Sequence, residues 1–269
     1  AIFVDKGFPY KNGPLNTSSI SITKRQDGSP LSSTVFYPTS PGLYGTFYFV
    51  TGANGMVVSS DYSDYLSQIA SHGFVVISAD LLWEDVAYAQ RFGFHFGDLY
   101  IEQLTWMQDH LEELLSKTVP GVTCSWEHLG LGSHSAGADS TLYMVARNHT
   151  LYQTELATHH APGFPPCMSD QFGYKHVWQL WQRPPRVRME IKGYGHCDIL
   201  NYNLWEECHK YHLCATPSNA SVLASYHVFT QGVTSAFLTS YLTGYEDNLK
   251  YVTNRTLLPV ETLDFAVDL

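Results

Sequence analysis

The stretch that decides the fold is Leu129-Gly130-Leu131-Gly132-Ser133-His134-Ser135-Ala136-Gly137. It begins as an apolar run, places Ser135 among small residues, and continues into the helix-forming segment 138–147. This order predicts a nucleophile elbow, in which a strand turns sharply into a helix and holds a serine hydroxyl at the apex. The turn needs small residues two positions before and after the serine, here Ser133 and Gly137, so serine replaces the usual first glycine. The alternative is an ordinary Ser/Gly-rich loop, and the strand–turn–helix context favours the elbow.

Strands and helices alternate on both sides of this elbow. Alternating or continuous apolar runs predict strands at 19–23, 33–38, 45–50, 73–79, 155–158 and 186–192. Apolar residues at helical spacing predict helices at 60–71, 98–117, 168–181 and 222–242. The first two strands indicate a hairpin, and the strand–helix–strand order of 45–79 predicts a right-handed parallel unit. We therefore expect one α/β domain over residues 1–269, with a mostly parallel, doubly wound sheet and helices on both faces.

Residues 82–97 are aromatic, irregular and glycine-bearing, which predicts a flap or a pocket rim. Seven aromatic side chains could wall an apolar ligand pocket: Trp83, Phe92, Phe94, Phe96, Trp106, Trp178 and Trp181. Ordinary core packing is the competing role, and we expect it for most of them.

Composition and charge exclude several classes of protein. The chain has 269 residues, of which 44% are hydrophobic and 15% charged, so it is globular rather than disordered. Its formal net charge of −10 argues against nucleic acid and against an anionic membrane surface as partners. No apolar run approaches the roughly 18 residues of a membrane span, so no transmembrane segment is expected.

Four N-x-[ST] sequons indicate a secreted, extracellular glycoprotein: Asn16, Asn148, Asn219 and Asn254. The chain begins at Ala1 without a signal peptide, which we interpret as an already processed secreted protein.

Five cysteines also fit an oxidising compartment. The segment Cys208-His209-Lys210-Tyr211-His212-Leu213-Cys214 has the ligand types of a zinc site, but close spacing and secretion favour a Cys208–Cys214 disulfide. The other disulfide candidates are Cys167 and Cys197, and no metal is predicted. Cys124, beside a core strand, is expected as a buried free thiol or paired with a residue absent from this sequence.

A serine hydroxyl needs an adjacent base to act as a nucleophile near neutral pH. His196 follows the strand 186–192 in a glycine-flanked loop, where the order serine, acid, histidine places the base. An oxyanion hole needs the backbone N–H after the nucleophile, here Ala136, and one from the loop after an early strand. Gly52 or Ala53 can give that second donor.

Further segments accompany the elbow: Tyr65-Leu66-Ser67-Gln68-Ile69-Ala70-Ser71-His72-Gly73-Phe74-Val75-Val76, Phe164-Pro165-Pro166-Cys167 and Gly193-Tyr194-Gly195-His196-Cys197-Asp198-Ile199-Leu200. Together with the closing helix and the tail around Leu258-Pro259-Val260, they resemble the chlorophyllase family from about residue 15 to the end. Platelet-activating-factor acetylhydrolases and cutinase-like esterases share the architecture. The resemblance implies an α/β-hydrolase fold and ester hydrolysis through Ser135 and His196, with no cofactor.

The sequence departs from that family at the acid. The family places its acid in a D-P-x-x-G segment, and the aligned stretch here has His159 where aspartate should stand. The interval from Ser135 to His196 is also short, which predicts a missing or deleted segment between about 148 and 165. Among substitute acids, Asp139 lies behind the nucleophile and Asp198 is too close in sequence to His196. Asp170 is the best remaining candidate, although it begins a helix.

These observations favour a secreted carboxylic ester hydrolase, a serine carboxylesterase of chlorophyllase type weakened by loss of its triad acid. Its partner would be an apolar ester or a pigment-like or lipid-like small molecule, and self-association stays open. The rival hypothesis is a catalytically silent glycoprotein that keeps the fold as a binding, structural or assembly module. An aspartate or glutamate within hydrogen-bond reach of His196 would separate the two.

Overall fold

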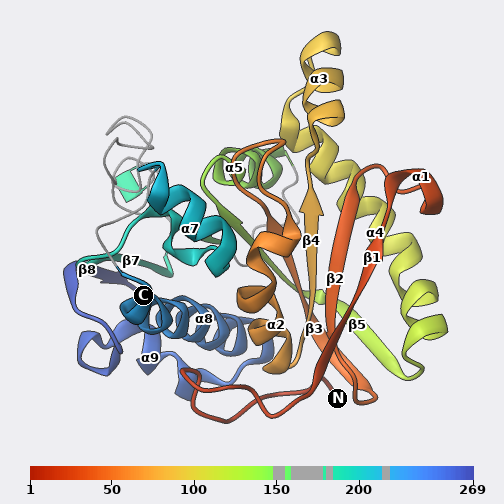
Figure 1. The fold of residues 1–269 in the computed structure, drawn as a ribbon. Coiled ribbons are helices and arrows are strands. Elements are labelled where there is room, and N and C mark those ends of the chain that lie inside the picture. Colours follow the sequence, from red (N-terminus) through yellow and green to blue (C-terminus); the bar gives the residue numbers. More distant parts are fainter. Residues whose placement is uncertain (148–154, 159–177, 180–183, 214–218) are drawn as a thin grey trace.

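A computed structural model of the chain describes residues 1–147, 155–158, 178–179, 184–213 and 219–269 (Figure 1). Within these residues a six-stranded sheet runs in the order β1-β2-β4-β3-β5-β6. Its strands are β1 Thr17–Ile22, β2 Ser32–Pro38, β3 Gly42–Val50, β4 Phe74–Asp80, β5 Val122–His134 and β6 Glu155–Thr158.

The sheet is mixed, whereas the sequence predicted a mostly parallel one. β3 pairs in parallel with β4 and β5, and β5 pairs in parallel with β6. The predicted hairpin is confirmed, since β1 pairs antiparallel with β2. That hairpin joins the sheet through an antiparallel β2–β4 pairing, which makes one side of the sheet antiparallel.

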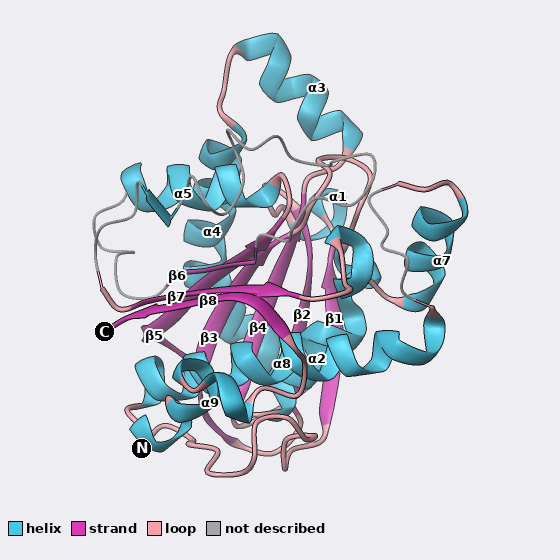
Figure 2. Cartoon of the chain, turned by 90° about the vertical axis from the view of Figure 1, so that its left-hand side faces the viewer, coloured by secondary structure: helices cyan, strands magenta, loops and turns pink. Residues whose placement is uncertain are grey.

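Helices cover both faces of the sheet (Figures 1 and 2). The α-helices are α1 Lys24–Asp27, α2 Ser63–Ser71, α3 Trp83–Phe92, α4 Phe96–Thr118, α5 Gly137–Arg147, α7 Tyr202–Lys210, α8 Ala220–Thr243 and α9 Lys250–Thr253. The 3-10 helices are η1 Ser59–Tyr62, η3 His196–Ile199, η4 Glu246–Asn248 and η5 Arg255–Leu257. The predicted crossover is confirmed, because α2 connects the parallel strands β3 and β4.

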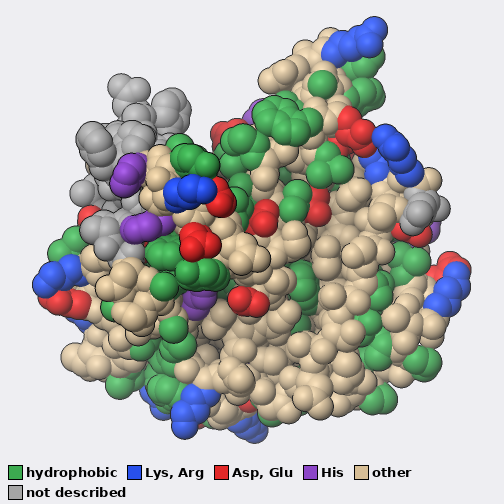
Figure 3. Space-filling model, viewed as in Figure 1, with side chains coloured by type: hydrophobic (Ala, Val, Ile, Leu, Met, Phe, Trp, Pro, Cys, Tyr) green, Lys and Arg blue, Asp and Glu red, His purple; other side chains and the backbone are tan. Residues whose placement is uncertain are grey.

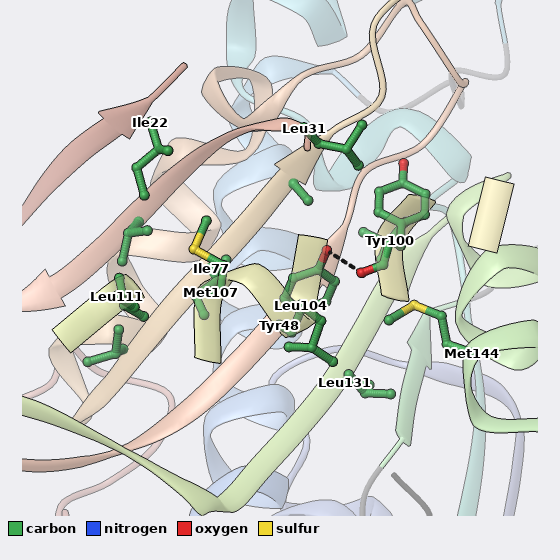
Figure 4. Close-up of a cluster of buried hydrophobic side chains, with 14 of the residues drawn as sticks. Ile22, Leu31, Tyr48, Ile77, Tyr100, Leu104, Met107, Leu111, Leu131 and Met144 are labelled. Atoms are coloured by element: carbon green, nitrogen blue, oxygen red, sulfur yellow. Dashed lines mark hydrogen bonds between the residues drawn. The ribbon is translucent and has the colours of Figure 1, made fainter. Parts of the chain in front are cut away.

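Side chains of β3 and β4 alternate between two hydrophobic clusters, as expected for strands buried on both faces. Val75 and Ile77 of β4 join the cluster that contains α4 and α5, which Figure 4 shows in part. Within it the Tyr48 hydroxyl donates to the backbone carbonyl of Tyr100, 3.2 Å away (Figure 4). Phe74 and Val76 face the opposite cluster, formed with α2 and α8.

The late strand differs from the prediction. β7, Arg186–Ile191, pairs antiparallel with β8, Thr262–Asp268, and these two form a sheet of their own in the described part of the chain. Ion pairs support the pairing: Arg186 Nε lies 2.9 Å from Asp268 Oδ2, and Arg188 Nη2 lies 2.7 Å from Asp264 Oδ2. The alternating arginines therefore match carboxylates near the C-terminus, a partner that local sequence patterns do not reveal.

The segment 82–97 is also more regular than predicted, since it holds α3. The Leu82 N–H donates to Asp85 Oδ2 at 3.0 Å, which satisfies a free amide at the start of the helix. Gly93 ends it with φ +72°, a left-handed conformation that glycine adopts without strain. α3 projects from the end of the molecule at which β4 ends (Figure 1). Across the described residues, no helix combines the length and apolar content needed to cross a bilayer.

Candidate functional site

The predicted elbow lies between β5, which ends at His134, and α5, which begins at Gly137. Ser135 has φ +56°, a left-handed conformation that costs a serine of order 1 kcal/mol and must be held by its surroundings. A Cβ on Gly137 would lie 2.6 Å from the carbonyl oxygen of Thr51 and 2.7 Å from that of Val50. Only glycine fits there, so α5 starts directly against the end of β3.

Ser133 stands where a nucleophile elbow usually has glycine, and its hydroxyl has a hydrogen-bond partner. Its side chain is buried, and Ser133 Oγ lies 2.9 Å from Thr141 Oγ1 of α5. This contact links the strand before the turn to the helix after it and explains how the elbow tolerates a polar residue at this position.

His196 lies beside the turn, as the sequence predicted. It opens η3 after β7, and its Nε2 lies 2.7 Å from Ser135 Oγ. The His196 side chain is buried, whereas Ser135 is half-buried and accessible. An imidazole nitrogen at this distance can accept the serine proton as a carbonyl is attacked.

Asp198 anchors the loop that carries His196. Its Oδ2 accepts from the Gly195 N–H at 2.8 Å, and its Oδ1 accepts from the Trp205 indole N–H at 2.8 Å. The carboxylate is fully buried. These contacts fix the start of η3 and tie it to α7, so the geometry of the loop depends on Asp198.

A second histidine, which the sequence reasoning missed, joins the two loops of the site. His134 Nε2 lies 2.9 Å from the backbone oxygen of His196, and its Nδ1 lies 2.8 Å from the Tyr62 hydroxyl. A carbonyl can only accept, so Nε2 carries the proton and Nδ1 accepts from Tyr62. Burial raises the pKa of Tyr62 far above its usual range, so this hydroxyl keeps its proton.

The Tyr62 hydroxyl accepts in turn from the Gly52 N–H at 3.1 Å. Three hydrogen bonds therefore run in one direction, from Gly52 to Tyr62, from Tyr62 to His134, and from His134 to the backbone of His196. The only signal for them in the sequence is the position of His134 directly before Ser135.

This network also bears on the two alternatives for the oxyanion hole. Because the Gly52 amide donates to Tyr62, the geometry favours Ala53 over Gly52 as the partner of Ala136. Gly52 has a different role, since a Cβ there would lie 3.0 Å from His134 Nδ1 and from Ser135 Cβ. A glycine lets this loop approach the elbow closely. Ala53 itself has φ +45°, a second strained residue in the same loop.

Among the described residues, the candidate acid Asp139 contacts a histidine other than His196. Asp139 is exposed in the first turn of α5, and its Oδ2 lies 3.2 Å from His95 Nε2. His159 and Asp170, together with the Asn148 sequon and the predicted gap at 148–165, lie wholly or largely outside the residues that the structure describes.

Among the described residues, Cys124, Cys197 and Cys208 are free cysteines. The partner predicted for Cys208, Cys214, lies outside the described residues, so this disulfide stays a prediction. Cys167 also lies outside the described residues. Cys124 is a buried free thiol, and burial raises its pKa to about 12. Within the described ranges, no group of three His, Cys, Asp or Glu side chains could hold a metal ion.

The predicted pocket aromatics separate into two sets. Phe96 and Trp106 of α4 pack against the core, and the Trp178 ring lies under the guanidinium of Arg186, 4.2 Å away. Trp181 lies outside the described residues. Trp83, Phe92 and Phe94 are exposed on or beside α3.

Asp80, at the end of β4, is the strongly perturbed carboxyl group near the site. Its pKa is raised to about 6 because the effect of burial exceeds that of the hydrogen bonds from Ser59, which lower the pKa. Ser59 N–H and Oγ both contact Asp80 Oδ1, at 2.7 and 2.5 Å. The folded chain therefore holds the proton of Asp80 more tightly than the unfolded chain, whose value is near 3.8. The stabilisation that comes from this tighter proton binding is complete below about pH 4, and it is lost as the pH rises through about 6.

We therefore expect Asp80→Asn, which keeps the accepting Oδ1, to raise the free energy of unfolding at pH 8 by about 1–3 kcal/mol. At pH 4 the variant should match the parent chain, since Asp80 is then protonated. Urea unfolding at the two pH values measures both quantities. A variant that is less stable at pH 8 would show instead that the ionised carboxylate is stabilised in the fold.

Comparison with known proteins decides the family. The chlorophyllase family model matches residues 7–159 and 150–268. The chain belongs to the chlorophyllase family. It is 28% identical over 140 residues to a chlorophyllase type 0 from Chenopodium album, a match that covers 51% of this chain and 39% of that relative. The chain thus matches well under half of the relative's length. At the level of the family, this membership suggests an ester hydrolase.

Proposed function

We propose that the chain is a serine carboxylesterase with the α/β-hydrolase fold that hydrolyses an apolar ester through Ser135 and His196. The observation that carries the proposal is the contact of 2.7 Å between His196 Nε2 and Ser135 Oγ, made at a turn where Ser135 has φ +56°. A strained serine that faces a buried histidine is the arrangement that nucleophilic catalysis needs. The parallel strands β4, β3, β5 and β6, with the elbow after β5, support the same fold.

In the proposed reaction, Ser135 Oγ attacks the ester carbonyl carbon while His196 Nε2 takes its proton. The Ala136 and Ala53 amides stabilise the negative charge on the carbonyl oxygen. His196 then returns the proton to the departing alcohol, which leaves an acyl group on Ser135. Water, deprotonated by His196, attacks the acyl carbonyl and releases the carboxylic acid and the free serine.

The proposed turnover is slow because His159 stands at the position of the family's acid. A triad acid holds the tautomer of the base and stabilises the imidazolium, and its loss costs about 10⁴ in turnover in the best-studied serine protease. A neutral imidazole supplies no charge, and a protonated one would repel the imidazolium of His196. His159→Ala should therefore change the turnover little.

The test is the reaction of the full chain with a fluorophosphonate probe, beside a serine esterase of known activity. We expect slow labelling confined to Ser135, with the modified peptide identified by mass spectrometry. Complete silence would contradict ester hydrolysis and favour the silent binding or assembly module. Labelling at the esterase's rate would instead show that an acid serves His196, and it would overturn the proposed loss of the triad acid.

Secretion and glycosylation are part of the proposal. Asn16, Asn219 and Asn254 are exposed, which is what glycosylation requires of a sequon. We expect at least two of the four sequons to carry sugar in native material, as peptide mapping before and after deglycosylation would show. Four unmodified asparagines would contradict the assignment to the extracellular space.

A further inference from the structure

α3 exposes aromatic side chains that a surface helix ordinarily buries. Trp83 is 62% exposed, Phe92 is 56% exposed, and Tyr88 and Phe94 are each 47% exposed. We call these four residues, together with the 64% exposed Met56, the α3 patch. Since Val86 and Ala89 already anchor the other face of the helix in the core, the patch is not needed to hold α3 in place.

Three rings of the α3 patch, those of Tyr88, Phe92 and Phe94, contact one another. The centroids of Tyr88 and Phe92 are 4.9 Å apart, and those of Tyr88 and Phe94 are 5.8 Å apart. In Figure 3 hydrophobic side chains lie along one edge and at the base of the upper projection of the molecule, with a basic group at its tip. A projecting, convex aromatic surface suits insertion into a soft phase better than docking into a rigid groove.

The surface around α3 is neutral to positive, although the chain as a whole is acidic. The two acidic residues of α3 are neutralised, because Glu84 pairs with Arg25 at 3.4 Å and Asp85 pairs with Lys24. The remaining charge is Arg91, whose guanidinium lies over the Phe92 ring at 5.3 Å. In a chain of net charge −10, α3 thus presents a neutral-to-positive surface, and Arg91 can reach a lipid phosphate while Phe92 is buried.

Both ends of α3 are tied to the elements that carry the site. Leu82 forms a bridge with Gly55, and a Cβ on Gly55 would lie 3.0 Å from the Trp83 ring. Gly55 belongs to the loop that also holds Gly52 and Ala53. After the helix, the His95 ring stacks on Tyr143 of α5 with centroids 3.8 Å apart. The α3 patch therefore borders the loop and the helix between which Ser135 is exposed.

We propose that the α3 patch docks the protein on the surface of an uncharged phospholipid layer, from which it takes an apolar ester. The inference rests on the proposed function, and it names the phase that supplies the substrate. A second copy of the chain is the competing occupant. A ten-residue helix is only about 15 Å long, and a stable dimer buries about 800 Å² per partner, which the patch alone does not supply.

The test is flotation of the full chain with phosphatidylcholine vesicles, which measures binding without turnover. We expect the parent chain to float, and the double variant Tyr88→Ser/Phe92→Ser to bind at least tenfold more weakly. The matched control is Tyr211→Ser/Leu263→Ser, which removes two equally exposed hydrophobic side chains elsewhere and should bind like the parent. Vesicles with added phosphatidylglycerol should bind more weakly, since their charge repels an acidic chain.

Three results would overturn the proposal. These are no flotation of the parent chain, equal losses in the two double variants, or a concentration-dependent dimer that Tyr88→Ser/Phe92→Ser abolishes while flotation is unchanged. Hydrolysis of a water-soluble short-chain ester separates this proposal from the proposed function, because Tyr88→Ser/Phe92→Ser should leave it unchanged. Flotation without any hydrolysis would contradict the esterase and leave the docking surface standing.

Discussion

Replacing Ser135 by alanine should lower the hydrolysis of an activated short-chain ester by about 10²–10³. The fall is smaller than the about 10⁶ measured for loss of the nucleophile in a complete triad, since the proposed starting activity already lacks the acid. What remains is the contribution of substrate binding and of the Ala136 and Ala53 amides, which need no nucleophile. Initial rates with p-nitrophenyl butyrate, together with fluorophosphonate labelling, measure the effect.

The control is Ser140→Ala, because Ser140 is a buried serine of α5 a short distance along the same helix. It should keep the parent rate, which excludes a general effect of losing a hydroxyl near the elbow. His196→Ala should match Ser135→Ala, and the double variant should be no worse than either, since the two residues act as one unit. Additive losses, or a Ser135→Ala chain with the parent rate, would contradict the proposed mechanism.

The sequence predicted the elbow and its histidine because both follow from local constraints. Ser135 is found from the small residues that a tight turn demands, and His196 from the glycine-flanked loop after a strand. The structure brings these residues, far apart in sequence, to within a hydrogen bond of each other. Because His196 follows β7, which lies in the separate sheet with β8, the contact with Ser135 depends on long-range packing as well as on these local patterns.

The errors have a common physical origin in long-range contacts. β7 looked like a strand of the main sheet, but its arginines pair with carboxylates of β8, which lies far along the chain. Periodicity also failed for α3, because its exposed face is as aromatic as a buried one. The start of that helix depends on Asp85, which contacts Leu82 and Lys24 together.

The hydrogen bonds from Tyr62 to His134 and Gly52 are also long-range contacts that the sequence analysis did not predict. A tyrosine in η1 and a histidine before the nucleophile carry no joint signal in the sequence, since only the fold brings them together. Their contacts nevertheless join the loop of Gly52 and Ala53, the proposed oxyanion donor, to the loop that carries His196. The position of each loop relative to Ser135 therefore depends on side chains that touch no reacting atom.

Tyr62→Phe should accordingly lower kcat about 10- to 100-fold and leave KM nearly unchanged. The phenyl ring keeps its contact with Phe49, but the Gly52 amide and His134 Nδ1 lose their hydrogen bonds with the Tyr62 hydroxyl. A loop shift of well under 1 Å is enough for a loss of this size, because catalysis depends steeply on the placement of the reacting groups. Removing the buried hydroxyl that both groups contact should also reduce the free energy of unfolding by about 1–3 kcal/mol.

The fall in stability alone would not prove a positioning role, and Tyr65→Phe provides the comparison. Tyr65 is a buried tyrosine of the adjoining helix α2, it also contacts Phe49, and its hydroxyl lies 2.8 Å from Thr234 Oγ1. Its loss should destabilise the chain by a similar amount while leaving kcat and the rate of fluorophosphonate labelling at the parent values. If the two variants lowered kcat equally, the effect would come from the packing of tyrosine hydroxyls in the core. A fall confined to Tyr62→Phe assigns it to the hydrogen bonds that hold Gly52 and His196 on either side of Ser135.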